Sequence, residues 1–417
     1  MDRSRNIEWI IIGIWIFLTI IGLVAIYSAT QGPGSEFLPS GIQDNFFKQS
    51  VFVAASLVMF FVILFMQPRI FQSASYAFYL FCIFLTISTL FIGVEVNGAK
   101  SWIRIGGINF QLSELTKLAT VMAVSAFLSG QRDIIGDKIG PALVVVAIIL
   151  FPAAIILFQN DLGTALVLVG LIPIMLFWSG IQYGIALLII SPVVIGYFTI
   201  IGWFYGAVVA ILFVVLIFLV QRRFILTAGS VVVGLAVVSS IQFILFKVLQ
   251  PHQRARINVF INPESDPLGA GWNVLQSRTA IGSGGFFGKG FLEGTQTQLR
   301  FIPEQWTDFI FTVIGEEFGL VGSSLVVILF TLLLLRLLNV AGMHKHPYAQ
   351  MVTVGVVGIY LIHIVINLGS ALGLLPVIGI PLPFVSYGGS SYIANTLMLA
   401  VCLNMWHHHR EMSIYAG

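Results

Sequence analysis

The chain has 417 residues, of which 58% are hydrophobic and only 9% are charged. Soluble domains carry roughly a quarter of charged residues. This composition therefore excludes a water-soluble globule, a disordered chain and a disulfide scaffold. The formal net charge of +3 gives no reason to expect a nucleic-acid partner. The sequence predicts an integral membrane protein, organised as a single membrane domain over 1–417.

Twelve apolar runs approach the length of about 20 residues that a helix needs to cross the hydrocarbon layer. The first is too long for the core of a signal peptide and is interpreted as a retained span. The run at 112–128 is the least typical, because it is short and carries Glu114 and Lys117. Together the runs predict an all-α polytopic fold with spans at about 8–27, 49–66, 74–93, 112–128, 141–158, 162–179, 183–200, 203–220, 225–249, 309–336, 348–370 and 386–405.

Basic residues in the short loops favour one side of this topology. That side collects Arg3, Arg5, Arg69, Arg132, Lys138, Arg222, Arg223, Arg336, Lys345 and Arg410, whereas the opposite short loops hold only Lys48, Lys100 and Arg104. Because Lys and Arg in short loops favour the cytoplasmic face, we expect both termini in the cytoplasm and the long segment 250–307 outside. A connector of this length is usually functional. We expect it to fold back over the helices as an external loop.

Ionisable residues within or beside the spans are the first candidates for a site, because a charge in the hydrocarbon layer is costly. Glu114 and Lys117 stand three residues apart on one helical face and can pair. This pair is either purely structural or serves substrate. Asp161 and Asp308 stand at helix starts, where each is either an N-cap or a group that meets substrate.

Glu316 and Glu317 are adjacent in a span, so their side chains point about 100° apart on a helix and cannot share one partner. At least one of them should meet water or a cation. The external loop carries the cations Arg254, Arg256, Arg278, Lys289 and Arg300. They either hold a phosphate or pyrophosphate or meet lipid headgroups. The run GSGGFFGKG lacks the Lys-Ser/Thr ending of a Walker loop, which argues against a nucleotide.

The same loop carries two acids, Glu264 and Asp266, between Pro263 and Pro267. Pro267 disfavours helix at Asp266. A carboxylate held on an extended or turning backbone above the membrane suits a general base for a surface-bound hydroxyl. An ordinary turn aspartate is the alternative.

The chain resembles the SEDS family, the shape, elongation, division and sporulation proteins. The resemblance rests on NPESDPLGAGWNVLQSRTAIGSGGFFGKGFLEGTQTQL, FIPEQWTDFIFTVIGEEFGLVG and LPVIGIPLPFVSYGGSS, with GAKSWIRIG, FQLSELTKLA and QNDLGTA in the expected order. The DPLGAG, GSGGFFGKG and GTQ motifs are nearer to the elongation branch, RodA, than to the division branch, FtsW. The family usually has ten spans, so the three runs in 180–249 indicate a two-helix insertion. The chain also departs from the family at Asn160, Gln305 and Trp306, where Pro and basic or His residues are common.

The resemblance implies a peptidoglycan glycosyltransferase in the bacterial cytoplasmic (inner) membrane. It would polymerise lipid II, the undecaprenyl-pyrophosphoryl disaccharide-pentapeptide, together with a class B penicillin-binding protein and other membrane proteins of the elongation complex. The family's essential loop aspartate falls on Asp266, which we assign as the general base of an inverting transfer. The expected substrate-binding residues are Trp102, Arg104, Glu114, Lys117, Asp161, Lys289, Asp308, Glu316 and Ser386.

No cofactor is assigned. An Arg, Lys117 or a divalent cation, Mg²⁺ or Mn²⁺, would neutralise the pyrophosphate, and the sequence leaves this choice open. An enzyme of the FtsW-like division branch is one alternative. Two other functions also fit buried charges between helices: a transporter that flips lipid II, and a scaffold that only recruits a transpeptidase. Chain growth from lipid II separates the enzyme from both.

Overall fold

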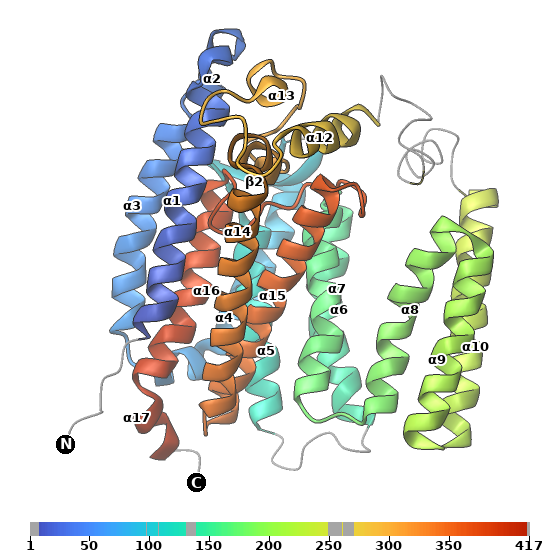
Figure 1. The fold of residues 1–417 in the computed structure, drawn as a ribbon. Helices are drawn as coiled ribbons and strands as arrows, with labels where there is room; N and C mark the ends of the chain where they lie inside the picture. Colours follow the sequence, from blue (N-terminus) through green and yellow to red (C-terminus); the bar gives the residue numbers. More distant parts are fainter. Residues whose placement is uncertain are drawn as a thin grey trace. The chain divides into compact units, whose positions relative to one another are not determined.

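A computed structural model of the protein describes residues 8–96, 98–106, 108–130, 139–248, 261 and 271–414. The predicted all-α membrane fold is confirmed, since each of the twelve predicted spans coincides with a helix (Figure 1). Among the described residues, ten helices are long and apolar enough to cross a membrane. Leu162–Trp178 is apolar but has only 17 residues. Gly389–His407 is almost wholly buried and carries Asn395 and Asn404.

The chain packs as two compact units. The first comprises Met1–Arg132, Leu143–Ile172 and Asn273–Gly417. It holds α1 (Trp9–Gln31), α2 (Ser40–Gln43), α3 (Asn45–Leu64), α4 (Pro68–Ile92), α5 (Leu112–Ser129), most of α6 (Ile139–Phe158) and of α7 (Leu162–Trp178), α12 (Trp272–Ser283) from its second residue, α13 (Thr295–Gln298), α14 (Ile310–Met343), α15 (Pro347–Ala371), α16 (Gly389–His407) and α17 (His409–Ile414).

The second unit comprises Asp133–Ala142 and Pro173–Trp272. The three apolar runs of 180–249 are three helices in it, α8 (Tyr183–Ile201), α9 (Trp203–Gln221) and α10 (Phe224–Phe243), which pack on one another. Only 11% of the most apolar stretch of α9, and the same share of α10, is buried within the protein. Helices that are apolar on all sides and so little covered are typical of lipid-facing spans. The single membrane domain over 1–417 stays a prediction.

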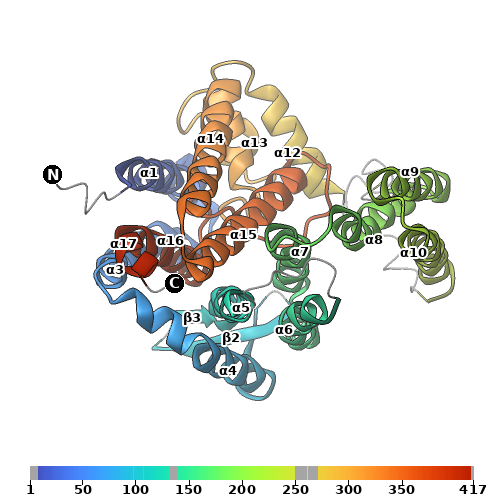
Figure 2. The same ribbon diagram turned by 90° about the horizontal axis from the view of Figure 1, so that it is seen from below.

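Helix α5 lies in the interior of the first unit, against α4, α15 and α16 (Figure 2). In α5, 78% of the apolar stretch is buried, against 28% in α4. The short and polar run at 112–128 is thus surrounded by protein. This explains how it carries Glu114 and Lys117, since charged groups in spans face the bundle interior.

A small antiparallel sheet, which an all-α prediction does not include, precedes α5. Its strands β1 (Val94–Val96), β2 (Ala99–Ile105) and β3 (Ile108–Gln111) lie in sequence order. Gly98 and Gly106 have φ of 83° and 56°, which glycine adopts without strain in the turns of hairpins. Trp102 is paired with Gln111 across β2 and β3. The sheet therefore brings Trp102 to the start of α5.

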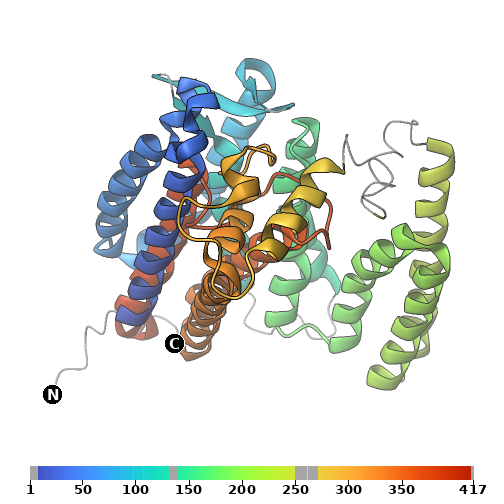
Figure 3. The same cartoon turned by 45° about the horizontal axis from the view of Figure 1, so that its top comes forward.

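The described part of segment 250–307 lies over one end of the first unit, as expected of a loop that folds back over the helices (Figure 3). Its run GSGGFFGKG packs backbone to backbone against α14, which departs from helical geometry at Gly319. The freed Leu320 N–H donates to Gly285 O at 2.9 Å. A Cβ on Gly288 would lie 2.0 Å from Glu317 O, so only glycine fits there. The glycines therefore allow the loop backbone to pack closely on α14 at the position where its helical geometry is interrupted.

Candidate functional site

A buried ionic cluster lies near the start of α5. Lys117 Nζ is 2.9 Å from Glu114 Oε1, and the two residues are 0% and 2% exposed. The predicted pair is therefore confirmed. Its third member, His363 of α15, was missed from the sequence: its Nε2 is 2.8 Å from Lys117 Nζ. An ionisable residue in the apolar run 348–370 was the available signal.

Asp161 links α7 to the sheet and to α5. Its Oδ1 accepts from the Thr164 N–H at 3.1 Å, the bond of an N-cap. Its Oδ2 accepts from Gln111 Nε2 at 2.7 Å, from Thr164 Oγ1 at 3.0 Å and from Ser113 Oγ at 3.3 Å. The N-cap interpretation is confirmed. Ser113 adjoins Glu114, so Asp161 lies at the same end of α5 as the ionic cluster.

Two of the predicted substrate-binding residues, Trp102 and Arg104, lie on strand β2 but differ in their exposure. Trp102 is half-buried beside Gln111, the partner of Asp161. Arg104 is exposed and donates from Nε to Asn109 Oδ1 at 3.1 Å. Trp102 therefore lies beside Gln111 at the start of α5, whereas Arg104 lies at the surface of the sheet.

The connection between α15 and α16, which includes Ser386, contacts the residues just before α14, where Asp308 lies. Ser386 Oγ donates to Thr307 O at 2.6 Å. Asn367 Nδ2 donates to Asp308 O at 3.1 Å and to Ile380 O at 2.8 Å. The stretch 376–386, called here the 376–386 segment, thus holds the start of α14 beside α15.

The carboxyl of Asp308 has an unusual protonation. It is not the N-cap of α14, since that position is Phe309 and no side chain caps the helix. Burial, and secondly the negative charge of Glu304, raises the pKa of Asp308 to about 7. Near neutral pH this carboxyl can both donate and accept a proton.

Lys289 of the loop and Glu316 of α14 form a separate pair. Lys289 Nζ is 2.7 Å from Glu316 Oε1. The same carboxylate accepts from the N–H groups of Gln296 and Thr297, each at 2.9 Å. Glu317 has different partners, the Ser28 hydroxyl and Gln298 Nε2. The prediction that the two acids diverge and that one meets a cation is confirmed.

The other departures from the family pattern have structural explanations. Asn160 has φ of 60°, a conformation that Asn tolerates and Pro cannot adopt. Gln305 is buried, and its Nε2 donates to Ala29 O at 3.3 Å. Trp306 is also buried, and its carbonyl accepts from the Tyr387 N–H at 2.9 Å.

Of the remaining candidate residues in the loop, four lie outside the described residues and Arg300 lies within them. Asp266, Glu264, Arg254 and Arg256 lie outside the described residues. Arg300 donates to Gly34 O at 3.2 Å and to Ala29 O, so it holds the loop to the end of α1. Within the described residues, no three His, Cys, Asp or Glu side chains gather to hold a metal ion.

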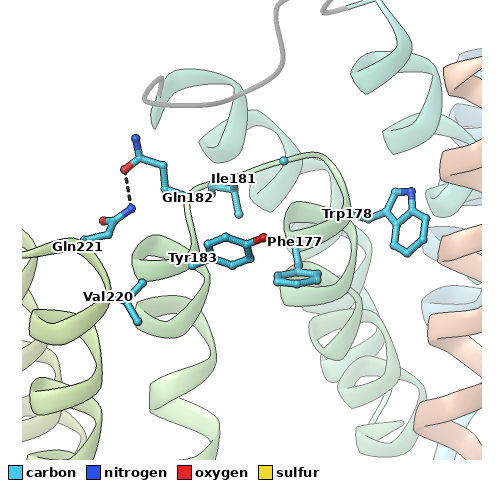
Figure 4. A pocket seen from close by; sticks show the side chains of 8 residues that line it. Phe177, Trp178, Ile181, Gln182, Tyr183, Val220 and Gln221 are labelled. Atoms are coloured by element: carbon cyan, nitrogen blue, oxygen red, sulfur yellow. Dashed lines mark hydrogen bonds between the residues drawn. The ribbon is translucent and has the colours of Figure 1, made fainter. Parts of the chain in front are cut away.

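A pocket of about 460 Å³ lies in the second unit (Figure 4). It is lined by Phe177, Trp178, Gly180, Ile181, Gln182, Tyr183, Val220 and Gln221. Gln221 Nε2 donates to Gln182 Oε1 at 2.7 Å across it. Its lining has neither a carboxylate nor a cation, so it is not the candidate site for transfer chemistry.

Comparison with known proteins places the chain in a family. Residues 8–206 and 205–411 match the FtsW/RodA/SpoVE model, described as cell cycle protein. The chain is 33% identical to the peptidoglycan glycosyltransferase RodA of Treponema pallidum (strain Nichols), over 98% of each chain. It is 32% identical to the peptidoglycan glycosyltransferase MrdB of Escherichia coli (strain K12), over 86% of this chain and 85% of that one.

A solved structure gives the same result for the fold. One chain of a peptidoglycan synthase complex that coordinates polymerization and crosslinking has 28% sequence identity and a TM-score of 0.73. The match covers 98% of this chain and 99% of that one. The resemblance inferred from the motifs is thus confirmed. The protein belongs to the FtsW/RodA/SpoVE family of cell cycle proteins, in the SEDS group.

Proposed function

We propose that the protein is a peptidoglycan glycosyltransferase that polymerises lipid II into β-1,4 glycan strands for cell elongation. The observation that carries the proposal is the gathering of family-motif residues at one end of α5, where Glu114, Lys117 and Asp161 lie. The two relatives are named peptidoglycan glycosyltransferases, and their sequences match 98% and 86% of this chain, which supports the same activity.

The proposed transfer inverts the anomeric carbon of the donor in one step and needs no protein nucleophile. The acceptor's 4-hydroxyl oxygen bonds to that carbon, and its proton passes to Asp266 as general base. The bond to the pyrophosphate breaks, and its electron pair leaves with the lipid pyrophosphate. Lys117 is the buried cation that we assign to the developing negative charge.

The placement of the helix ends supports the proposed setting in the cytoplasmic membrane. Figure 1 shows the first turn of α1 and α17 at one end of the first unit, with the sheet, α12 and α13 at the other. With the basic short loops on the cytoplasmic side, both termini would be cytoplasmic and the loop external.

A class B penicillin-binding protein is the proposed partner, because the matched chain belongs to a complex that joins polymerization to crosslinking. Other membrane proteins of the elongation complex would assemble with this pair.

The test is glycan-chain formation from labelled lipid II by the purified protein, with and without the class B partner. Asp266→Asn keeps the size of the side chain but removes its charge, so polymerisation should fall by about 10²-fold or more. Glu264→Gln is the matched control and should remain near wild type. Normal polymerisation by folded Asp266→Asn protein would remove Asp266 from the mechanism. A wild-type protein that moves lipid II across vesicles without lengthening glycan would favour the transporter.

A further inference from the structure

Among the residues that the structure describes, Lys117 has two partners, whereas an ammonium has three N–H donors. One partner is Glu114 Oε1 at 2.9 Å and the other is His363 Nε2 at 2.8 Å. Lys117, Glu114 and His363 are 0%, 2% and 1% exposed. The described part of the chain thus occupies two of the three donors of a fully buried cation.

The second nitrogen of His363 determines how the ring meets Lys117. His363 Nδ1 lies 3.0 Å from Pro381 O. A carbonyl oxygen only accepts, so Nδ1 carries the hydrogen. In the neutral ring Nε2 is then an acceptor, which suits an ammonium donor at 2.8 Å. A protonated ring would instead place two cations against each other, so the neutral tautomer fits these contacts.

His363 belongs to a polar stripe along α15 that holds the 376–386 segment. His363, Asn367 and Ser370 follow the i, i+4, i+7 spacing of one helical face. Asn367 Nδ2 donates to Ile380 O at 2.8 Å, and Ser370 Oγ donates to Pro376 O at 3.0 Å. Of these three side chains, His363 is the one that also contacts the ionic cluster. It therefore couples Lys117 to the segment.

We propose that His363 is a positioning residue for Lys117. It accepts one N–H of the ammonium while its own Nδ1–H is held by Pro381, so the cation keeps one orientation with its third N–H available. This inference rests on the proposed function, in which that N–H meets the pyrophosphate as the glycosidic carbon–oxygen bond to it breaks. Because the charge on the leaving group grows in the transition state, loss of the orientation should affect kcat more than KM.

The experiment compares three purified variants by kcat and KM for lipid II and by Tm in detergent. His363→Phe keeps a planar ring but removes both nitrogens. His363→Gln restores an acceptor for Lys117 and a donor for Pro381 on one amide. Ser370→Ala is the matched control, since it releases one contact to the 376–386 segment without touching Lys117.

For His363→Phe we expect kcat to fall about 10-fold or more with KM within about twofold, as for a misoriented catalytic group. His363→Gln should recover most of kcat, and Ser370→Ala should keep wild-type kcat. If the Phe protein does not fold, His363→Met takes its place, because the flexible thioether fits irregular space and is only a weak acceptor.

Two results would overturn the inference. One is a folded Phe or Met variant with wild-type kcat. The other is a loss of kcat that follows the loss of Tm across all variants, including Ser370→Ala, since this is what a merely structural role produces. In both cases wild-type polymerisation leaves the proposed function intact. Absence of glycan from the wild type, with and without the partner, would overturn the proposed function and this inference together.

Discussion

Lys289 and Glu316 meet across 27 residues of sequence, with Nζ 2.7 Å from Oε1. The Glu316 side chain is fully buried, whereas that of Lys289 is 24% exposed. The carboxylate also binds the N–H groups of Gln296 and Thr297 at the start of α13, where a negative charge is favourable. The contacts of Glu316 anchor the loop to α14, and the expectation that both residues bind substrate stays a prediction.

The Glu316→Gln variant should be markedly less stable. Its single amide oxygen replaces a carboxylate that accepts from a cation and two backbone N–H groups, and a buried N–H left without an acceptor costs about 1–3 kcal/mol. Lys289→Met should be milder, because Glu316 keeps both backbone donors. Thermal unfolding in detergent measures both variants. A Glu316→Gln protein with wild-type Tm and no polymerisation would return Glu316 to a substrate role.

The Glu114–Lys117 pair should behave as a unit. Replacing either residue alone with Ala leaves the other partner buried without its counter-charge, at a cost of several kcal/mol. The neutral double variant Glu114→Gln/Lys117→Met should therefore be more stable than either single variant. Folded but inactive double-variant protein would mean that the pair serves substrate, and recovered polymerisation would leave it only a structural role.

Asp308→Asn should change the pH dependence of stability. Burial, with Glu304, raises the pKa of Asp308 from 3.8 to about 7. Between these values the folded state binds more protons than the unfolded state, so the wild type loses stability as pH rises through 7. The Tm of Asp308→Asn minus that of the wild type should therefore grow from about pH 4 to pH 7 and level off above. A pH-independent difference would contradict the raised pKa.

Gly288→Ala should destabilise the junction of the loop with α14. Gly288 has φ of 82°, and a Cβ would lie 2.0 Å from Glu317 O. The left-handed backbone alone costs about 1–2 kcal/mol for alanine, and the clash adds to it. Gly282→Ala is the control, because a Cβ there meets nothing within 4 Å and α12 should gain slightly. Equal Tm values for the two variants would contradict this account.

The sidedness of the chain can be tested with single cysteines at Arg222 and Phe287. Arg222 is exposed at the end of α9, and Phe287 is 83% exposed. The native Cys82 and Cys402 are buried, so they should react little. An impermeant thiol reagent on intact spheroplasts should label position 287 and should label position 222 only after permeabilisation. The reverse pattern would overturn the predicted orientation.

Local features of the chain predicted much of the fold and part of the site. The twelve spans were found because each is a contiguous apolar run. Glu114 and Lys117 were paired correctly because residues three apart share a helical face. For Asp161 the place before an apolar run suggested an N-cap as one of two alternatives, and the structure shows the capping bond. The sheet was missed, because its short strands lie between two long spans.

The sequence by itself determined which segments form helices in a membrane, because a span needs about 20 contiguous apolar residues. It also determined the short-range pairs, which helix geometry imposes. Only the tertiary structure decided three long-range contacts. His363 contacts Lys117, and Gln111 donates to Asp161. Glu316 pairs with Lys289. These contacts depend on which helices and loops pack together. Since the partners lie 27 to 246 residues apart, no local periodicity encodes them.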